Sequence, residues 1–300
     1  MLDIKKIQST NTVTIIGTLN ELNIEEKTTA DGRAYVHGTA NVKVDQEING
    51  TMVENIIPVR MFSMRLKKDK TPNAVYDGIV RMKETFTSAA AAESPEQVSR
   101  VAITSGQLQE NIWIDKTTNN PRSSFQISSN FINKANRDDV EKATFELSGV
   151  IGDMKDELDK DGEETGRLII KFLVVGYLGK VDMIELIAEK PEAVNHIKNN
   201  WEKGDTVTLA GIVNMTYEVK TWMEEQGFGA PIERRKTVSK KELIITSGSP
   251  SGLDEDYSYD NDAIKIALEE RAGRIEKLKN DAKAKAKTTT SSAKSFDVGF

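Results

Sequence analysis

The sequence contains no cysteine and only two histidines in its 300 residues. Without cysteine the chain can form neither a disulfide framework nor a thiolate metal site. The two histidines, His37 and His196, lie in different halves of the chain, so we expect no metal site and no cofactor. Residues 1–6 lack the apolar segment of a signal peptide, and no apolar run is long enough to span a bilayer. We therefore expect a cytoplasmic protein without a membrane partner.

Motifs of catalysis are missing as well. No glycine-rich segment matches a nucleotide-binding loop or a dinucleotide-binding fingerprint. Paired carboxylates such as Asp159 and Asp161 lie in a charged turn beside lysine, and no histidine or other nucleophile accompanies them. We therefore expect a protein that is not an enzyme.

The composition is that of a folded, globular protein, with 38% hydrophobic and 29% charged residues. The length allows two domains of ordinary size. A net charge of −6 would argue against a nucleic-acid partner only if the charge were spread evenly, because binding depends on the local potential. The charges therefore have to be judged segment by segment.

Alternation of apolar and polar residues predicts strands in the first half of the chain. Apolar residues occupy every second position over residues 11–19, 33–44 and 57–61. The spacing of Val75, Ile79, Met82 and Phe86 predicts a helix over residues 72–87. Residues 106–133 then predict a hairpin of two strands. The order is three strands, a helix and two strands.

The second half repeats this order. Residues 143–151 resemble the opening strand, with Gly149 at the position of Gly17. A charged turn over residues 159–166 precedes a strand at 167–177, and a short strand at 181–188 leads into a helix at 191–201. Two more strands are predicted at 203–213 and 237–246. An internal repeat of this length predicts two copies of one fold, joined near residues 133–141.

This connectivity is that of the OB-fold, a small Greek-key barrel. We therefore expect a mainly β protein with two OB-fold-like five-stranded barrels, each with a helix between its third and fourth strands. The first domain would cover residues 1–135 and the second residues 140–248. An acidic linker at 249–262, a helix at 263–287 and a disordered tail at 288–300 would follow.

Short motifs in both halves resemble the phage and bacterial single-stranded-DNA-binding protein family. They are the segments 14–17 (TIIG), 58–62 (PVRMF), 106–108 (GQL) with Trp113 and Asp115, 125–127 (FQI) and 203–207 (KGDTV) with Gly211. The resemblance implies a non-enzymatic protein that coats single-stranded DNA during replication or recombination. Two barrels in one chain depart from the usual bacterial form and fit a phage-encoded protein acting in the cytoplasm of a bacterial host.

Binding of single strands requires exposed aromatic rings for the bases and cations for the phosphates. The side of each predicted strand that faces away from the core carries such residues, and we expect them to bind single-stranded DNA: Arg33, Tyr35, His37, Lys43, Arg60, Phe62, Arg65 and Trp113. Trp113 lies between Ile112 and Ile114. If these two isoleucines point into the core, Trp113 points away from it. It could instead cover a barrel end or pack against the second domain. Phe125 and Phe131 share the parity of Ile127, and we expect both in the core.

The second half offers a different set of candidates. The outward residues of its second strand are largely apolar, which favours a buried contact: Arg167, Ile169, Lys171, Leu173, Val175 and Tyr177. Candidate DNA-binding residues cluster instead in the loop between its last two strands: Trp222, Phe228, Arg234 and Arg235. A solvated charged hairpin with an aromatic brace would have the same sequence.

The C-terminal residues Phe296, Asp297 and Phe300 resemble the partner-recruiting tip found in the same family, which implies contacts with replication or recombination enzymes. An unstructured end is the alternative. For the whole protein, the alternative to DNA binding is a structural or assembly protein whose tandem barrels contact other proteins. RNA in place of DNA also remains open, because stacking accepts either and discrimination depends on the 2′-hydroxyl.

Overall fold

Strands make up most of the chain, so the prediction of a mainly β protein is confirmed. The structure is a computed structural model that describes residues 1–228 and 230–292. Its strands are β1 (Asn11–Thr28), β2 (Ala34–Ile48), β3 (Thr51–Met64), β4 (Arg100–Ile114), β5 (Pro121–Ser128), β6 (Asn133–Lys134), β7 (Lys142–Leu158), β8 (Glu164–Val175), β9 (Val181–Ala188), β10 (Thr206–Glu224) and β11 (Ile232–Gly248). The α-helices are α1 (Ala74–Thr85), α2 (Pro191–Asn200) and α3 (Asn261–Ser292).

The strands β1 to β5 form a closed ring of hydrogen-bonded pairs, which we call the first ring. β1 pairs with β2, β2 with β3, β3 with β5, β5 with β4, and β4 again with β1. All these pairs are antiparallel except β3–β5, which is parallel. Alternate side chains of β2 point into the ring, where Val36, Ala40, Val42 and Val44 are fully buried.

A second ring has the same order of pairs. β7 pairs with β8, β8 with β9, β9 with β11, β11 with β10, and β10 again with β7. Here too a single pair, β9–β11, is parallel. α1 connects β3 to β4 in the first ring, and α2 connects β9 to β10 in the second. The chain order of three strands, a helix and two strands is thus the predicted one in each ring.

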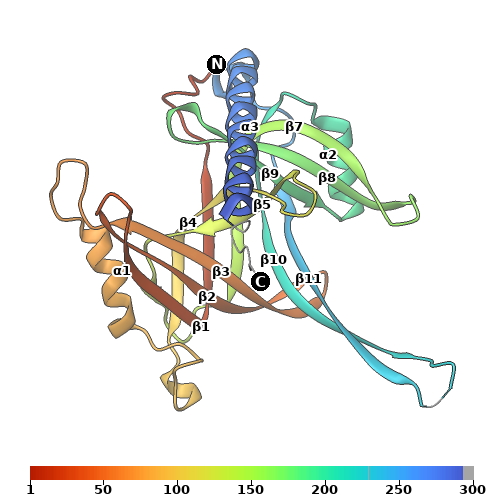
Figure 1. Ribbon diagram of the computed structural model, residues 1–300. Coiled ribbons are helices and arrows are strands. Elements are labelled where there is room, and N and C mark those ends of the chain that lie inside the picture. Colours follow the sequence, from red (N-terminus) through yellow and green to blue (C-terminus); the bar gives the residue numbers. More distant parts are fainter. Residues whose placement is uncertain (229, 293–300) are drawn as a thin grey trace, which may run out of the picture.

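The two rings are joined through β1 and β7, which pair antiparallel from Asn11 opposite Leu147 to Ile16 opposite Lys142. β1 can do this because β2 pairs only with its later residues, from Thr18 onward. The eleven strands of the described residues therefore belong to one sheet, and one hydrophobic core continues through both rings. Figure 1 shows the first ring, in red to yellow, beside the second, in green to blue.

Buried amides strengthen the joint between the rings. The side chain of Gln46 donates to the carbonyl of Val213 at 2.8 Å and accepts from the amide of Ala143 at 2.8 Å. Asn55, which has no exposed surface, accepts from the amide of Met215 at 2.7 Å. A buried polar group costs free energy when it has no hydrogen-bond partner, so these contacts favour this arrangement of the rings.

The helices begin and end for local reasons. α1 follows Asn73, whose side-chain oxygen accepts from the amide of Val75 at 3.2 Å, and it buries Tyr76, Ile79 and Met82. Pro191, the first residue of α2, has no amide hydrogen to leave unpaired at a helix start. Both helices lie within the ranges predicted for them.

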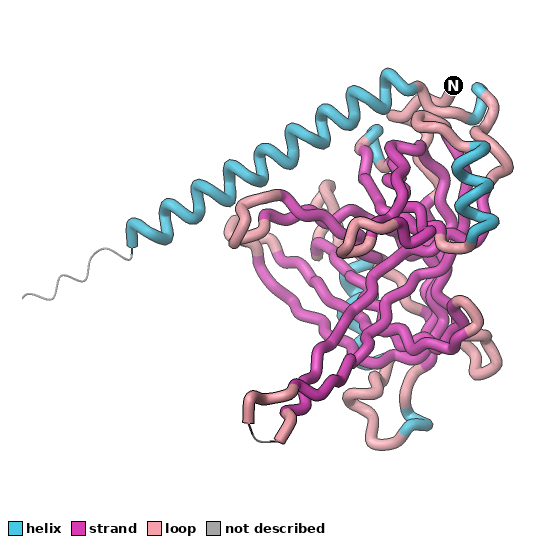
Figure 2. The backbone as a smooth tube through the Cα atoms, turned by 90° about the vertical axis from the view of Figure 1, so that its right-hand side faces the viewer, coloured by secondary structure: helices cyan, strands magenta, loops and turns pink. Residues whose placement is uncertain are grey.

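α3 packs against both rings with its first half. Ile264 and Ala267 are buried together with Leu173 and Val175 of β8 and with Tyr259. This contact accounts for the apolar outward face predicted for the second half, because the chain covers that part of it with its own helix. The helix spans more residues than the predicted range 263–287. Its second half extends away from the rings (Figure 2).

The largest difference from the predicted strands is the length of the β10–β11 hairpin. The predicted strands ended at Val213 and began again at Thr237, whereas the pairing continues to Glu224 opposite Ile232. We call residues 217–239 the arm; it protrudes from the rings (Figure 1). Its residues are largely polar, so hydrophobic alternation gave no sign of strands that are held by backbone hydrogen bonds to each other.

Phe131 corrects a second expectation. Phe125 is buried, as predicted, but Phe131 is 57% exposed. β5 ends at Ser128, so the alternation of Phe125 and Ile127 does not continue to Phe131, and Ile132 is the buried residue of this segment. In the part of the chain that the structure describes, no helix combines the length and the hydrophobicity needed to cross a membrane.

Gly17 and Gly149 have the same role in the two rings. A Cβ atom on Gly17 would lie 2.1 Å from the carbonyl oxygen of Lys43, and one on Gly149 would lie 2.3 Å from that of Leu173. Each glycine therefore allows the next strand of its ring to cross at close range. The correspondence that the sequence indicated between these two positions holds in their packing.

Replacing Gly149 by alanine is expected to lower the free energy of unfolding by about 1–3 kcal/mol, because the backbone of β8 has to move away from the new methyl group. Urea denaturation measures this change. Gly273→Ala is the matched control: its methyl group would meet no atom within 4 Å, and alanine favours a helix interior. Equal stability of the two variants would contradict the packing described for Gly149.

Candidate nucleic-acid interface

Three aromatic side chains of the first half lie together on the outer surface of β2 and β3. Phe62 pairs with His37 across the two strands, and Tyr35 is two residues before His37 on the same face. The ring centroids of Tyr35 and Phe62 are 5.7 Å apart, and those of Tyr35 and His37 are 5.8 Å apart. Phe62 is 54% exposed, which is unusual for a phenylalanine in a regular strand. These three residues form a surface that we call the aromatic row.

Several cations predicted at this interface are already paired with carboxylates. Arg33 contacts Asp31 at 2.8 Å, beside the aromatic row. Lys43 contacts Glu54 at 2.6 Å, and this hydrogen bond raises the pKa of the Lys43 ammonium. Both pairs are on the surface, where such contacts are weak and exchange with solvent. Because each of these cations lies beside a carboxylate, the two pairs add little net positive charge to this surface in the free protein.

Arg60 is in a different environment. It lies on β3, two residues before Phe62 on the same outward face, and it is exposed. Lys241 of β11 approaches from the other ring: its Nζ donates to Ser124 Oγ on β5 at 2.7 Å and lies 4.8 Å from the ring centroid of Phe125. Burial lowers the pKa of the Lys241 ammonium, and the charge of Arg60 lowers it further. Among the described residues, neither cation forms an ion pair with a carboxylate.

Arg65 lies just beyond the end of β3. Its backbone amide donates to the carbonyl of Ala34 at 3.0 Å, which places it at the Tyr35 end of the aromatic row. The side chain is exposed. Arg60 and Arg65 therefore lie before and after Phe62 along the chain.

Trp113 is exposed, at 43%, but it does not join the aromatic row. It pairs with Arg122 across the β4–β5 hairpin, whereas Arg60 lies opposite Ser128 at the other end of β5. Six residues of β5 separate the two positions, which corresponds to about 20 Å along the strand. Trp113 and Arg122 thus form a separate aromatic and cationic pair. Lys241, at Ser124, lies between the two ends.

The arm carries the remaining candidates. Trp222 faces Arg234 across the hairpin, and Arg234 Nε contacts Glu224 at 2.6 Å. Arg235 is paired with Glu233, also at 2.6 Å. Phe228 at the tip is 93% exposed. The arm therefore presents apolar side chains, and both of these arginines are matched by glutamates.

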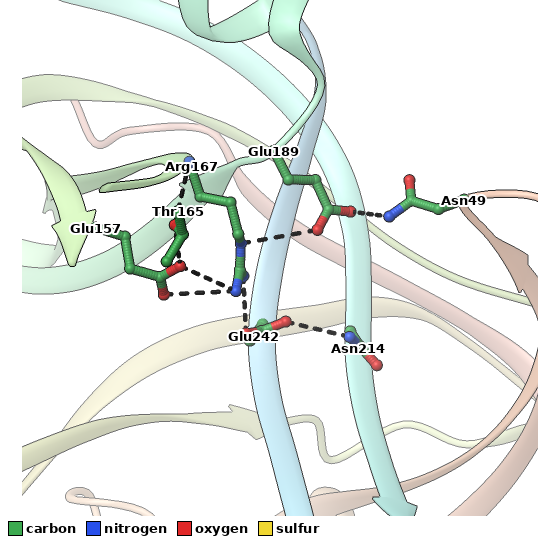
Figure 3. Close-up of polar contacts among 7 residues, drawn as sticks. All are labelled: Asn49, Glu157, Thr165, Arg167, Glu189, Asn214 and Glu242. Carbon is green, nitrogen blue, oxygen red and sulfur yellow. Dashed lines mark hydrogen bonds and ion pairs between the residues drawn. The ribbon is translucent and has the colours of Figure 1, made fainter. Parts of the chain in front are cut away.

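Among the described residues, the second ring offers no comparable face. Arg167 is the first residue of the predicted outward face of β8. Three glutamates surround its guanidinium (Figure 3): Glu157, Glu189 and Glu242. Burial acts to lower the pKa of Arg167, but the hydrogen bond to Glu242 and the three negative charges raise it above its usual value. Further along β8, Leu173 and Val175 are covered by α3. This surface is acidic at one end and covered at the other.

The predicted tail residues Phe296, Asp297 and Phe300 lie outside the described residues. Within the described part, no group of histidine and carboxylate side chains is arranged to hold a metal ion. His37 contacts Glu25 at 3.6 Å, and His196 of α2 packs edge-on against Trp201, the residue that follows this helix.

Lys241 is the residue that the sequence interpretation missed. It has the parity of Leu243 and Ile245, both buried in the second ring, so it continues the inward face of β11 beyond that ring. This parity was visible in the sequence. The contact with β5 was not, because it depends on how the two rings are joined.

The YorF family model matches residues 9–281 of the chain. No curated protein matches this chain. Among solved structures, the wild-type single-stranded DNA binding protein from Thermus aquaticus has a TM-score of 0.48 and 13% sequence identity, covering 85% of this chain and 99% of that one. A deletion mutant of the same Thermus protein has a TM-score of 0.47 and 14% identity, covering 83% of this chain and 97% of that one.

Proposed function

The chain belongs to the YorF family, and from the outer surface of its first ring we propose that it is a non-enzymatic protein that coats single-stranded DNA. The role we propose is in DNA replication or recombination, in a phage-encoded protein. The residues that carry the proposal are Tyr35, Phe62 and Arg60. The observation on which it depends is an exposed aromatic row beside Arg60, an exposed cation that forms no ion pair with a carboxylate among the described residues.

Stacking explains why an exposed phenylalanine would be kept on a strand. A base stacked on an aromatic side chain contributes ~1–3 kcal/mol, and it does so for every base because each has a π-face. Tyr35 and Phe62 are close enough to present one continuous surface to such bases. The backbone that joins the bases is anionic, so it favours unmatched cations such as Arg60.

The order of strand pairs supports the interpretation that each ring is an OB-type barrel. A five-stranded Greek-key barrel with a helix after its third strand has this connectivity. In OB-folds the surface over strands 2 and 3 binds oligonucleotides, and the aromatic row lies on β2 and β3. On this interpretation the first barrel binds DNA, and the second positions α3 and the arm.

One observation favours the alternative of a protein-binding function. Four apolar side chains at the end of the arm are exposed: Trp222, Met223, Phe228 and Ile232. Exposed apolar groups of this kind are typical of contacts with other macromolecules. The arm lies apart from the aromatic row, so a protein contact there is compatible with DNA binding on the first ring.

Titration with oligo-dT at several salt concentrations tests the proposed function. We expect binding that weakens with salt, with a slope of log affinity against log salt of about −0.7 for each phosphate contacted. A contact at Arg60 alone requires a slope of about −0.7 or steeper. Oligo-rU and duplex DNA serve as competitors. Affinity that does not respond to salt, or equal competition by duplex DNA, would contradict the proposal.

A further inference from the structure

Lys241 belongs to the second ring by sequence and to the first ring by position. It is in β11, at the base of the arm, and its parity is that of the residues packed inside the second ring. Its ammonium nevertheless lies on β5, bound to Ser124 Oγ at 2.7 Å. Ser124 is held in turn, because its hydroxyl lies 3.1 Å from the carbonyl of Phe125, to which it can donate. The position of the ammonium is therefore set by the joint between the rings.

The charges around Lys241 do not balance. Arg60 is near enough for its charge to lower the pKa of Lys241, and burial acts in the same direction. Several other cations on these surfaces have carboxylate partners: Arg33 with Asp31, Lys43 with Glu54, Arg234 with Glu224 and Arg235 with Glu233. Two neighbouring cations without such partners in the described chain repel each other, and a bound anion would relieve that repulsion.

The position of the two cations also matches a strand path. Arg60 is two residues from Phe62 on one face of β3, about 7 Å along the strand. Lys241 lies beside β5 at Ser124, and the Trp113–Arg122 pair lies two residues further along β5. The order along this surface is thus aromatic row, Arg60, Lys241, and then Arg122 with Trp113. A chain of phosphates that starts at the aromatic row meets each cation in turn.

We propose that Lys241 is a phosphate-binding residue that the second ring supplies to the strand path on the first ring, so that the DNA site is built by both halves of the chain. This inference rests on the proposed function and adds to it the route of the backbone. The DNA phosphates would occupy the space between the first ring and the base of the arm. The second ring then takes part in binding even though its own outward face is covered.

The test compares Lys241→Ala with Lys240→Ala, its neighbour on the same strand. Lys240 is on the opposite side of β11, where it lines a separate cavity with Asn214 and Glu242. Lys241→Ala is expected to weaken oligo-dT binding about tenfold at low salt and to reduce the salt slope by about 0.7. Combining it with Arg60→Ala should reduce the slope by about 1.4. Lys240→Ala should leave the slope unchanged.

A phosphodiester oligomer without bases separates the two proposals. Wild-type protein should bind this probe at low salt, Lys241→Ala should lose that binding, and Phe62→Ala should retain it. If wild-type protein binds neither oligo-dT nor the base-free oligomer, the proposed function itself fails. If wild-type protein binds oligo-dT with a steep salt slope while Lys241→Ala behaves like Lys240→Ala, DNA binding stands and the role of Lys241 is wrong. Melting temperatures of the variants confirm that each is folded.

Discussion

Phe62→Ala is expected to weaken oligo-dT binding by about 10- to 100-fold. The change removes the most exposed ring of the aromatic row, and stacking on one aromatic side chain contributes ~1–3 kcal/mol per base. The ring centroids of Phe62 and Tyr35 are 5.7 Å apart, so the change also breaks up the continuous surface that the two side chains offer to bases. Fluorescence anisotropy of a labelled oligonucleotide measures the change.

Two variants distinguish stacking from a general loss of structure. Phe62→Trp keeps a flat ring and should retain binding. Tyr177→Ala removes a side chain that is 72% exposed, in the short 3-10 helix between β8 and β9, and should bind as the wild type does. Because Phe62 is exposed, its replacement should change the free energy of unfolding by less than about 0.5 kcal/mol. Full binding by a folded Phe62→Ala protein would exclude the aromatic row as the site.

Arg271→Ala should lower the free energy of unfolding by about 3 kcal/mol. The guanidinium of Arg271 on α3 donates twice to the carboxylate of Glu110 on β4, once from Nε at 2.8 Å and once from Nη2. The side chain of Glu110 is only 2% exposed, and removing its partner leaves a buried, unpaired negative charge. The hydrogen bond that Arg271 donates to Glu110 is also what raises the pKa of Arg271. Chemical denaturation measures the loss.

Lys277→Ala is the control for this variant, since Lys277 is an exposed cation further along the same helix. Its replacement should leave the unfolding midpoint within experimental error. A double variant, Glu110→Leu with Arg271→Leu, should recover most of the lost stability, because an apolar pair can replace a buried ion pair without large cost. If Arg271→Ala and Lys277→Ala unfold alike, the contact does not hold α3 to the first ring.

The order of elements was predictable from the sequence because the rings are small and regular. Each strand of the first ring alternates apolar and polar residues, as in β2, and each helix shows helical spacing or a starting proline. The joint between the rings was not predictable. It depends on β1 pairing with β7 along an edge that β2 leaves open, and nothing local in residues 11–16 distinguishes one partner strand from another.

The candidate site was predictable only in part, for a similar reason. The parity of Tyr35, His37 and Phe62 placed them on one face, and the structure brings these three together. Trp113 has the parity of an outward residue as well, but parity does not give distance along a strand. The pairing of Lys43 with Asp45 and Glu54 was partly visible, since Asp45 lies two residues on and shares its face.

The shared edge of β1 and β7 decides how this protein can be divided. A cut between the two halves would leave residues 11–16 of one half and 142–147 of the other without the strand that pairs with them across the joint. Each fragment would then carry an open row of amides and carbonyls next to buried side chains such as Val13 and Phe145, and such open strands associate with one another. The boundary between the two rings is therefore a division in the sequence, and it offers no place at which either ring could be isolated with its surface complete.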